Sequence, residues 1–302
     1  MSFEVPEGWE NFYYIVSQKY ESLIDKKVIN HIDKLRLNGW LHQFHTLEEK
    51  YLAAHLLDSF IYRTDKMNKS VYEHILYVKL PLLLENQGCF SYSSVNEFIT
   101  TLTNSREPEL KFATIEKRMG SSKSGGVYLR EFRVQNSIQQ FYFINSSQLH
   151  STTSSCEAIV FIDDIVGTGK DFIAFYSEYE LDKIIDKKLI YIPLIAHEDG
   201  VKKIKDECSN VNVSPVEILT KEHNFFSDNN GNGIWSKDKS NKSSDVIHFY
   251  QNFLRKKNIY NRNYYQGKGK LGLSIFFAES SPNNSLSIYY TDKNGWLSLV
   301  DR

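Results

Sequence analysis

The chain has 302 residues, of which 41% are hydrophobic and 24% charged, and its formal net charge is −1. This length predicts two domains, and the composition is ordinary for a soluble globular protein. The near-zero charge excludes a globally basic nucleic-acid coat protein, and an aromatic content of 14% argues against disorder.

The three cysteines, Cys89, Cys156 and Cys208, are odd in number and far apart, without any CxxC pairing. This pattern excludes a disulfide scaffold and a zinc ribbon, and it favours a reducing, cytoplasmic location. Residues 1–9 lack the basic and apolar pattern of a signal peptide. No apolar run is long enough to cross a bilayer, so we expect no membrane partner.

The first 90 residues or so have the pattern of helices. Apolar residues recur at helical spacing between Leu23 and Leu41, and Thr46 and Glu49 have the spacing of a capping box. A further helix is expected from Lys69 through Leu84. Since no alternation of strands and helices occurs here, we expect a helical, winged-helix-like module over residues 1–94.

Strand-like runs begin after about Ser91, and several of them alternate with helical patterns. The strands are expected at 112–115, 127–133, 141–144, 158–162, 189–196, 213–219 and 273–277, and the helices at 172–185, 200–209 and 245–257. This alternation predicts a mainly parallel α/β sheet in a second domain, residues 95–302. Residues 227–244 are rich in Asn, Ser, Lys and Gly and predict a long surface loop.

The most informative segment is 158–171, where an apolar strand ends in Asp163 and Asp164, followed by Gly167-Thr168-Gly169 and a helix. Strand alternation points the two carboxylates in different directions. The glycines allow backbone N–H groups to turn toward an anion, and the helix start adds its positive dipole end. The segment therefore suits a ligand that carries both hydroxyls and a phosphate.

Two other interpretations apply to this segment. Gly169-Lys170 looks like the end of a P-loop, but that motif requires a glycine at the position of Asp164 and Ser or Thr at the position of Asp171. Both requirements fail, which argues against a P-loop NTPase. An acidic strand end with a glycine turn and no ligand stays open as the structural alternative.

The segment resembles the phosphoribosyl diphosphate (PRPP) loop of type I phosphoribosyltransferases, with an apolar strand, an acidic pair and then Thr-Gly. It departs at Asp171, where the family usually has Thr or Ser. Other parts of the chain resemble the phosphoribosyltransferase-like domains of bacterial conflict systems. These parts are Lys123 to Tyr128 with Arg130, Arg133 and Asn136, then Gly272-Leu273, Phe276-Phe277, Ser281 to Ile288, and Lys293 to Trp296 with Leu299.

The resemblance implies a type I phosphoribosyltransferase-like, mainly parallel α/β sheet preceded by a helical winged-helix-like domain. It assigns the ribose hydroxyls, and Mg²⁺ shared with pyrophosphate, to Asp163 and Asp164. It implies that Lys123 neutralises a leaving pyrophosphate, beside Ser124 and Gly125. The 5′-phosphate would be held by the segment Val166, Gly167, Thr168, Gly169, Lys170 and Asp171.

Related domains occur in antiphage loci, including some retrons, as toxic effectors partnered with a reverse transcriptase and its RNA or DNA product. The resemblance therefore implies an effector that binds PRPP or a related nucleotide and acts at ribose C1′. Asp171 keeps open a catalytically inactive nucleotide sensor or regulator, whose N-terminal module binds nucleic acid or a partner protein.

Charge is distributed unevenly along the chain. Residues 1–100 hold 10 Lys or Arg and 13 Asp or Glu, whereas residues 221–270 hold 10 and 4. A DNA-binding winged helix is expected to be basic, so the acidic module fits a protein–protein or homo-oligomer role at least as well. The basic stretch would steer phosphorylated ligands or nucleic acid, or form a solvated loop and helix end.

Weaker candidates each have a structural alternative. Trp235 would stack on a nucleobase or tether the long loop, and Pro282 to Ser285 would contact a ligand or form a turn. Trp296 would plug the core. His197, at a strand end, would be a site residue or a satisfied interior histidine.

Overall fold

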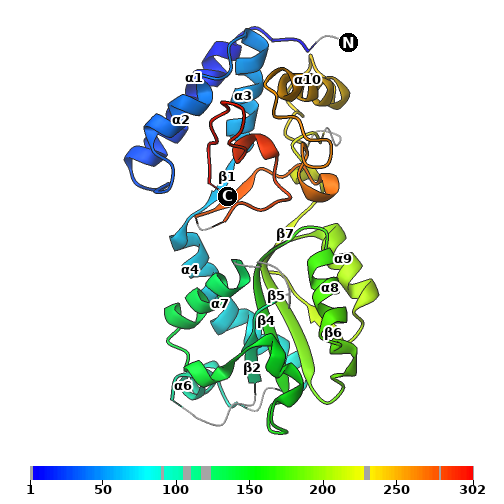
Figure 1. The fold of residues 1–302 in the computed structure, drawn as a ribbon. Helices are drawn as coiled ribbons and strands as arrows, with labels where there is room; N and C mark the ends of the chain where they lie inside the picture. Colours follow the sequence, from blue (N-terminus) through cyan, green and yellow to red (C-terminus); the bar gives the residue numbers. More distant parts are fainter. Residues whose placement is uncertain are drawn as a thin grey trace. The chain divides into compact units, whose positions relative to one another are not determined.

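The computed structural model describes residues 3–89, 92–104, 110–116, 124–227, 232–278 and 280–301. The chain divides into two compact units (Figure 1): unit 1 comprises residues 1–65 and 220–302, and unit 2 comprises residues 66–219. This division differs from the predicted boundary between residues 94 and 95. The reason is that both ends of the chain contribute to the hydrophobic core of unit 1.

Unit 1 begins with three helices and also contains a long helix near the other end of the chain. Its elements are α1 (Trp9–Asp25), α2 (Lys34–Leu41), α3 (Leu47–Ser59), β1 (Ile61–Arg63), α10 (Ser243–Lys256) and β8 (Ile275–Phe277), with 3-10 turns at Lys221–His223, Lys268–Lys270 and Ser287–Tyr289. Thr46 caps α3 by accepting a hydrogen bond from the Glu49 amide, as the capping-box spacing predicts. The predicted helical start is confirmed, whereas a winged-helix arrangement stays a prediction.

The core of unit 1 is rich in aromatic side chains. Trp40, Phe44, Phe253 and Trp296 pack together, with the Phe44 and Phe253 rings stacked at 5.1 Å. β1 and β8 form a two-stranded parallel pair in this core. The predicted strand 273–277 therefore exists in part, as β8, but it pairs with the beginning of the chain and not with the larger sheet.

Unit 2 is built on a parallel sheet, which confirms the predicted α/β class. Its strands are β2 (Leu110–Ala113), β3 (Phe143–Ile144), β4 (Ala158–Val166), β5 (Lys188–His197), β6 (Val211–Val213) and β7 (Glu217–Leu219). The order is β3-β2-β4-β5-β6, with β7 also paired to β5, and every pairing is parallel. β4 and β5 are central, and nearly all their residues are buried, as expected for strands covered on both faces.

Helices cover both faces of this sheet. In Figure 1, α7 lies on one side of the sheet, and α8 and α9 lie on the other. The elements are α4 (Asp65–His74), a π-helical turn Ile75–Lys79, α5 (Leu80–Asn86), α6 (Val95–Asn104), α7 (Ser124–Gln135), α8 (Lys170–Glu178) and α9 (Glu198–Glu207), with 3-10 turns at Gln140–Tyr142, Ser146–Ser151 and Leu181–Lys183.

The predicted strand 127–133 is wrong, because this segment forms α7. Tyr128, Leu129 and Phe132 are buried, whereas Val127 and Val134 are exposed. That pattern has the period of a helix, and packing of this apolar stripe against the sheet outweighs the strand propensity of valine and the aromatic residues.

Three further observations bear on the expectations. The cysteines are free and buried, without a disulfide among them. Residues 232–242 lie outside helices and strands, in agreement with the predicted long loop, while residues 228–231 lie outside the described ranges. Across the residues that the structure describes, no helix has the length and hydropathy of a membrane span.

Candidate functional site

The acidic pair lies at the carboxyl end of the central strand β4. Residues 158–162 are fully buried, and Asp163 and Asp164 follow where the strand leaves the core. β4 lies between β2 and β5 in the sheet, so the pair lies at the edge where ligand sites of open α/β sheets form. Both predicted carboxylates therefore lie at this edge of the sheet, and their role in a reaction stays a prediction.

The two carboxylates have different partners, as strand alternation predicts. Asp163 accepts a hydrogen bond of 2.9 Å from the Tyr191 hydroxyl on β5, and Asp164 accepts one of 2.8 Å from the Ile165 amide. Burial, and then the charge of Asp164, raise the pKa of Asp163 well above its ordinary value. The pair therefore retains a proton at a pH where two exposed aspartates would both be ionised.

A second hydrogen-bonded pair lies within electrostatic reach of Asp164. The Tyr72 hydroxyl on α4 donates a hydrogen bond of 2.8 Å to Glu131 on α7. Burial raises the pKa of Tyr72 far above its ordinary value, and the hydrogen bond to Glu131 and the charges of Glu131 and Asp164 raise it further. The Tyr72 hydroxyl thus stays neutral, and it donates its hydrogen bond to Glu131 within electrostatic reach of Asp164.

The glycine loop after β4 is shaped by close backbone contacts with α9. Gly169 caps α8 with a φ of 74°, in the left-handed region that favours glycine. A Cβ on Gly169 would lie 2.7 Å from the Gly200 carbonyl oxygen, and a Cβ on Gly200 would lie 2.2 Å from the Gly167 oxygen. Glycine at 200 therefore allows α9 to support the loop.

The side chains at the beginning of α8 differ in exposure. Thr168 is half-buried, whereas Lys170 and Asp171 are exposed. Asp171 lies in the first turn of α8, where a carboxylate interacts favourably with the helix dipole. The same charge lies beside the proposed phosphate cradle, where it opposes an anionic ligand.

The predicted pyrophosphate segment is described only in part. Lys123 lies outside the described residues, and Ser124 and Gly125 are the first residues of α7, with side chains outside the described set. β2 runs parallel to β4, so residues 114–116, which follow β2, leave the sheet at the same edge as the acidic pair. A pyrophosphate-binding role for Ser124 and Gly125 stays a prediction.

Comparison with known proteins identifies the family. The PRTase-CE family matches residues 37–302. The chain belongs to the PRTase-CE family. A solved structure, the Helicobacter pylori xanthine-guanine-hypoxanthine phosphoribosyltransferase, aligns with 53% of this chain and 84% of its own, at 14% identity and a TM-score of 0.27. No curated protein matches the chain.

In this PRTase-CE chain, three of the weaker candidates have structural roles. Trp235 is 2% exposed and stacks on His55 at 3.7 Å, so it tethers its loop. Trp296 is buried and donates to the Ile288 carbonyl. Asn284 donates to the Lys268 carbonyl at 2.8 Å, which favours a turn role for residues 282–285.

His197 is also an interior residue. It is 2% exposed, and its Nδ1 accepts a hydrogen bond of 3.2 Å from the Asp199 amide at the start of α9. His197 thus caps the helix that carries Gly200. His197 is the last residue of β5, so its cap fixes the beginning of α9, whose first turn contains Gly200.

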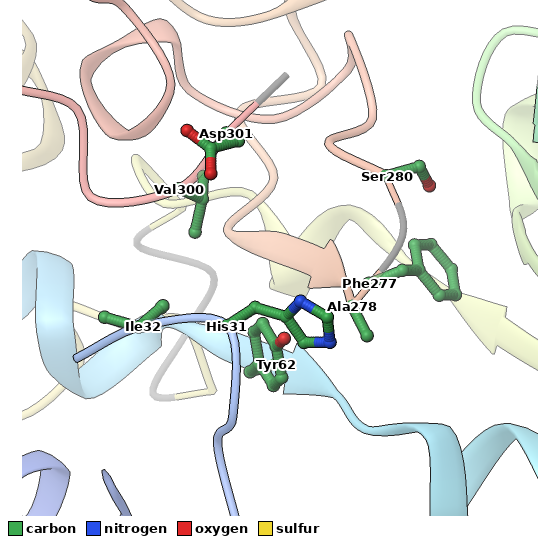
Figure 2. A pocket seen from close by; sticks show the side chains of 8 residues that line it. All are labelled: His31, Ile32, Tyr62, Phe277, Ala278, Ser280, Val300 and Asp301. Atoms are coloured by element: carbon green, nitrogen blue, oxygen red, sulfur yellow. The ribbon is translucent and has the colours of Figure 1, made fainter.

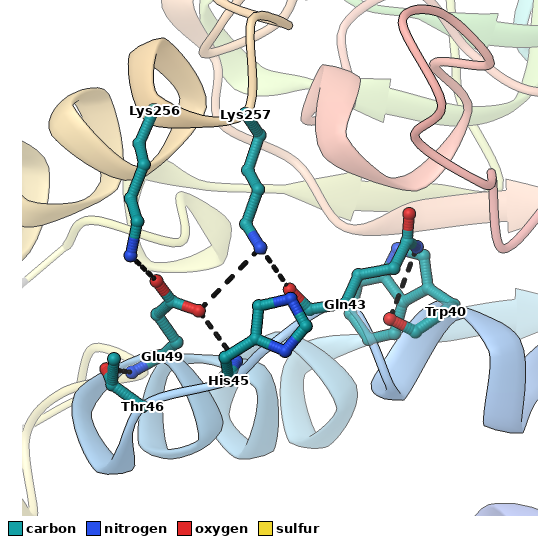
Figure 3. Close-up of polar contacts among 7 residues, drawn as sticks. All are labelled: Trp40, Gln43, His45, Thr46, Glu49, Lys256 and Lys257. Carbon is teal, nitrogen blue, oxygen red and sulfur yellow. Dashed lines mark hydrogen bonds and ion pairs between the residues drawn. The ribbon is translucent and has the colours of Figure 1, made fainter.

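Two lysines of the basic stretch are part of the fold of unit 1 (Figure 3). Glu49 is 3% exposed, and its carboxylate lies 2.7 Å from Lys256 Nζ and 3.8 Å from Lys257 Nζ. Its Oε2 also accepts a hydrogen bond from the His45 amide. Lys256 and Lys257 therefore have a structural role, because their ion pairs with Glu49 connect the end of α10 to α3.

Unit 1 also contains a small pocket of about 210 Å³ (Figure 2). His31, Tyr62, Ser280 and Asp301 contribute its polar groups, and Phe277 is among its apolar residues. Asp301 is held there by Arg36, whose Nη1 donates to it at 2.7 Å. The volume is too small for a nucleotide, so we assign no ligand to this pocket.

Proposed function

We propose that the chain binds PRPP, or a related nucleotide, at the end of β4 and acts at ribose C1′. The observation that carries this proposal is the continuity of the acidic pair with a glycine loop and a helix start. Asp163 and Asp164 lie four and three residues before Gly167, where the Gly167–Gly169 turn begins, and α8 begins at Lys170. Carboxylates for ribose hydroxyls thus adjoin backbone amides for a 5′-phosphate.

The proposed reaction is transfer of the phosphoribosyl group. The bond between C1′ and the pyrophosphate oxygen breaks, and a bond from C1′ to a nucleophile forms. Pyrophosphate leaves with the bonding electron pair, and the proton of the nucleophile passes to solvent. Positive charge develops on the ribose in the transition state, and the carboxylates of Asp163 and Asp164 would stabilise it. With an N-nucleotide as substrate and water as nucleophile, the same site would cleave the N-glycosidic bond.

Mg²⁺ is the proposed cofactor. Carboxylate oxygens are donors that Mg²⁺ prefers, and the acidic pair fits it as two such donors, with water and ligand phosphates completing the shell. The ion would lower the pKa of Asp163 by replacing its proton, so it would counter the effect of burial. We therefore expect ligand binding to depend on Mg²⁺.

Calorimetric titration of the full chain with PRPP, NAD and AMP, with and without MgCl₂, tests the proposal. We expect Mg²⁺-dependent binding of at least one ligand by the wild type and none by the double variant Asp163→Asn, Asp164→Asn. The matched control is Asp182→Asn, Asp186→Asn, which changes two exposed carboxylates of unit 2. Equal binding by the acidic-pair variant would contradict the proposal.

A catalytically inactive nucleotide sensor is the second candidate. Asp171 supports it, because a negative charge beside the cradle lowers phosphate affinity and the usual hydroxyl is missing. A sensor would bind the same ligands in the titration but leave PRPP intact during prolonged incubation. Release of pyrophosphate, measured by a coupled assay, separates the two candidates.

For the cellular role we propose a toxic effector of antiphage defence, partnered with a reverse transcriptase and its nucleic-acid product. The support is the resemblance of residues 123–136 and 272–299 to domains of bacterial conflict systems. Expression of the chain alone in bacteria is expected to stop growth, and the Asp163→Asn, Asp164→Asn variant is expected to be harmless. Toxicity that persists in this variant would contradict an effector role for the site.

A further inference from the structure

A larger pocket of unit 1, which we call the tyrosine pocket, is lined by residues that follow α10 and by residues near the end of the chain. It has a volume of about 510 Å³, and its walls include Tyr260, Asn261, Tyr264, Tyr290, Asp292 and Lys293. This volume is of the size that holds a nucleobase with its sugar. Side chains from two distant parts of the chain thus form a mixed aromatic and polar wall.

The segment that contributes Tyr260 and Tyr264 is strongly basic. Residues 246–278 contain six Lys or Arg and no Asp or Glu. Lys256 and Lys257 form ion pairs with Glu49 (Figure 3). The remaining four cations are Arg255, Arg262, Lys268 and Lys270. Even without Lys256 and Lys257, the segment that contributes Tyr260 and Tyr264 to the tyrosine pocket therefore has an excess of positive charge.

Tyr264 presents an exposed aromatic ring. Its side chain is 43% exposed, and within the described ranges no hydrogen bond or ring contact joins it to another residue. Tyr260 differs, because the Arg255 guanidinium lies 4.5 Å from its ring centroid and Tyr265 lies against it at 5.4 Å. Exposed aromatic rings beside cations are the elements on which successive bases of a single strand stack.

A rigid loop follows Tyr264 directly and presents a lysine. The Gly267 amide donates to the Tyr264 carbonyl at 2.9 Å, and a Cβ on Gly267 would lie 2.1 Å from the Asn284 oxygen. The backbone φ is positive at Gly267, Gly269 and Lys270. The loop is therefore fixed by packing. The exposed Lys270 lies six residues after Tyr264 in this loop.

The carboxylates of the tyrosine pocket are offset by cations. Asp301, which lines both this pocket and the smaller one, accepts hydrogen bonds from the Arg36 guanidinium, which also donates to the Ser298 carbonyl at 3.1 Å. Asp292 lies within electrostatic reach of the same guanidinium and adjacent in sequence to Lys293. These acids thus do not cancel the positive charge of the neighbouring segment.

We propose that the tyrosine pocket and the basic segment bind single-stranded nucleic acid. A base stacks on Tyr264, and backbone phosphates contact Arg262 and Lys270. Binding depends on stacking and charge, so it has little sequence preference and falls steeply with salt. The site belongs to unit 1 and does not depend on the proposed PRPP site of unit 2.

Fluorescence anisotropy with a 5′-labelled 15-residue oligo(dT) tests the proposal on the full chain. The wild type is expected to bind at 50 mM NaCl, and Tyr264→Ala is expected to weaken binding by about tenfold. Tyr264→Phe keeps the ring and is expected to bind like the wild type. Arg262→Ala is expected to weaken binding and to reduce the dependence on salt.

The matched controls are Tyr14→Ala and Lys26→Ala, which remove an exposed ring and an exposed cation from the opposite end of the chain and are expected to bind normally. Circular dichroism of each variant verifies the fold. Three results would each overturn the proposal. They are no binding by the wild type, equal binding by Tyr264→Ala, and binding of AMP or of a 15-base-pair duplex in preference to the single strand.

Discussion

Gly200 in α9 lies so close to Gly167 that a Cβ at position 200 would be 2.2 Å from the Gly167 carbonyl oxygen. A real Cβ does not approach an oxygen this closely. The contacted atom belongs to the backbone, so it cannot rotate away as the end of a side chain can. The first turn of α9 therefore determines the conformation of the loop that follows the acidic pair.

Gly200→Ala is expected to displace this loop. We expect a loss of about 1–3 kcal/mol in the free energy of unfolding, as for overpacking of a core, and a loss of PRPP binding. Denaturant unfolding and calorimetry measure the two effects. Gly39→Ala is the control, since its Cβ would meet only the exposed, flexible end of Leu297 at 3.3 Å. Unchanged ligand binding in Gly200→Ala would show that the loop is not part of the site.

Asp171→Thr is expected to change stability and ligand affinity in opposite directions. The carboxylate in the first turn of α8 interacts favourably with the helix dipole, so its removal is expected to cost about 0.5 kcal/mol of stability. Removal of the same charge, with a hydroxyl in its place, is expected to tighten PRPP binding. Thermal unfolding and calorimetry test both signs, and Glu178→Thr at the other end of α8 is the control.

Asp163→Asn is expected to leave the fold intact. Because burial raises the pKa of Asp163, the protonated form is favoured in the folded state. The stability due to this group is therefore complete below the ordinary pKa, about 4, and is lost as the pH rises through the elevated folded pKa. Asparagine cannot ionise, so the variant is expected to lose less stability between pH 5 and pH 8 than the wild type. A variant that loses as much as the wild type would argue against the raised pKa.

Glu49→Gln is expected to weaken the junction of α3 and α10. Burial alone would raise the pKa of Glu49, but the hydrogen bonds from Lys256 and His45 and the charges of both lysines outweigh it, so the pKa lies below its ordinary value. A depressed pKa means stability that is present above about pH 4.3 and is lost as the pH falls through the folded pKa.

We therefore expect the free energy of unfolding of Glu49→Gln to be about 1–2 kcal/mol lower than that of the wild type at pH 7. Because glutamine cannot be protonated, acid is expected to lower the stability of the variant less than that of the wild type. Asp58→Asn removes an exposed carboxylate 3.7 Å from Lys19 and is expected to change stability by less than about 0.5 kcal/mol. Equal effects of the two substitutions would contradict the role given to the buried carboxylate.

His55 is expected to contribute to the acid sensitivity of unit 1. Burial lowers its pKa to about 4, against the opposing charge of Asp238, and its Nε2 has no hydrogen-bond partner among the described residues. The unfolded chain binds a proton near pH 6.5 and the folded chain does not. Stability is therefore lost as the pH falls from about 6.5 to 4, on the order of 3 kcal/mol. His55→Phe keeps the stack on Trp235 and is expected to flatten this loss in a pH series of melts.

The predictions from sequence succeeded where the pattern was local. An uninterrupted apolar run that ends in Asp163 and Asp164 identified β4, because a central parallel strand is buried on both faces and polar residues occur only where it leaves the core. The capping box at Thr46 was equally local. The strand predicted at 127–133 failed because buried Tyr128 and Phe132 fit both periods over so short a run.

Partners distant in the chain could not be predicted. Tyr191 is one apolar-strand residue among several, and nothing in its neighbours indicates a hydrogen bond to Asp163. Gly200 had a weak signal, a glycine just inside a helix start, where its low helix propensity requires a reason such as close packing. The assignment of both chain ends to unit 1 depends on the pairing of β1 with β8, three-residue strands whose partners are set by tertiary packing.

The pairing of Ile61 with Ile275 also sets an order of assembly. Unit 2 is a continuous stretch of chain, so it is completely synthesised before the second half of unit 1 leaves the ribosome. Unit 1 can close only when residues near the end of the chain return to its beginning, a slow, non-local step. A nascent or prematurely terminated chain would thus contain the acidic pair in a folded sheet but no tyrosine pocket, so the two proposed activities would arise at different times during synthesis.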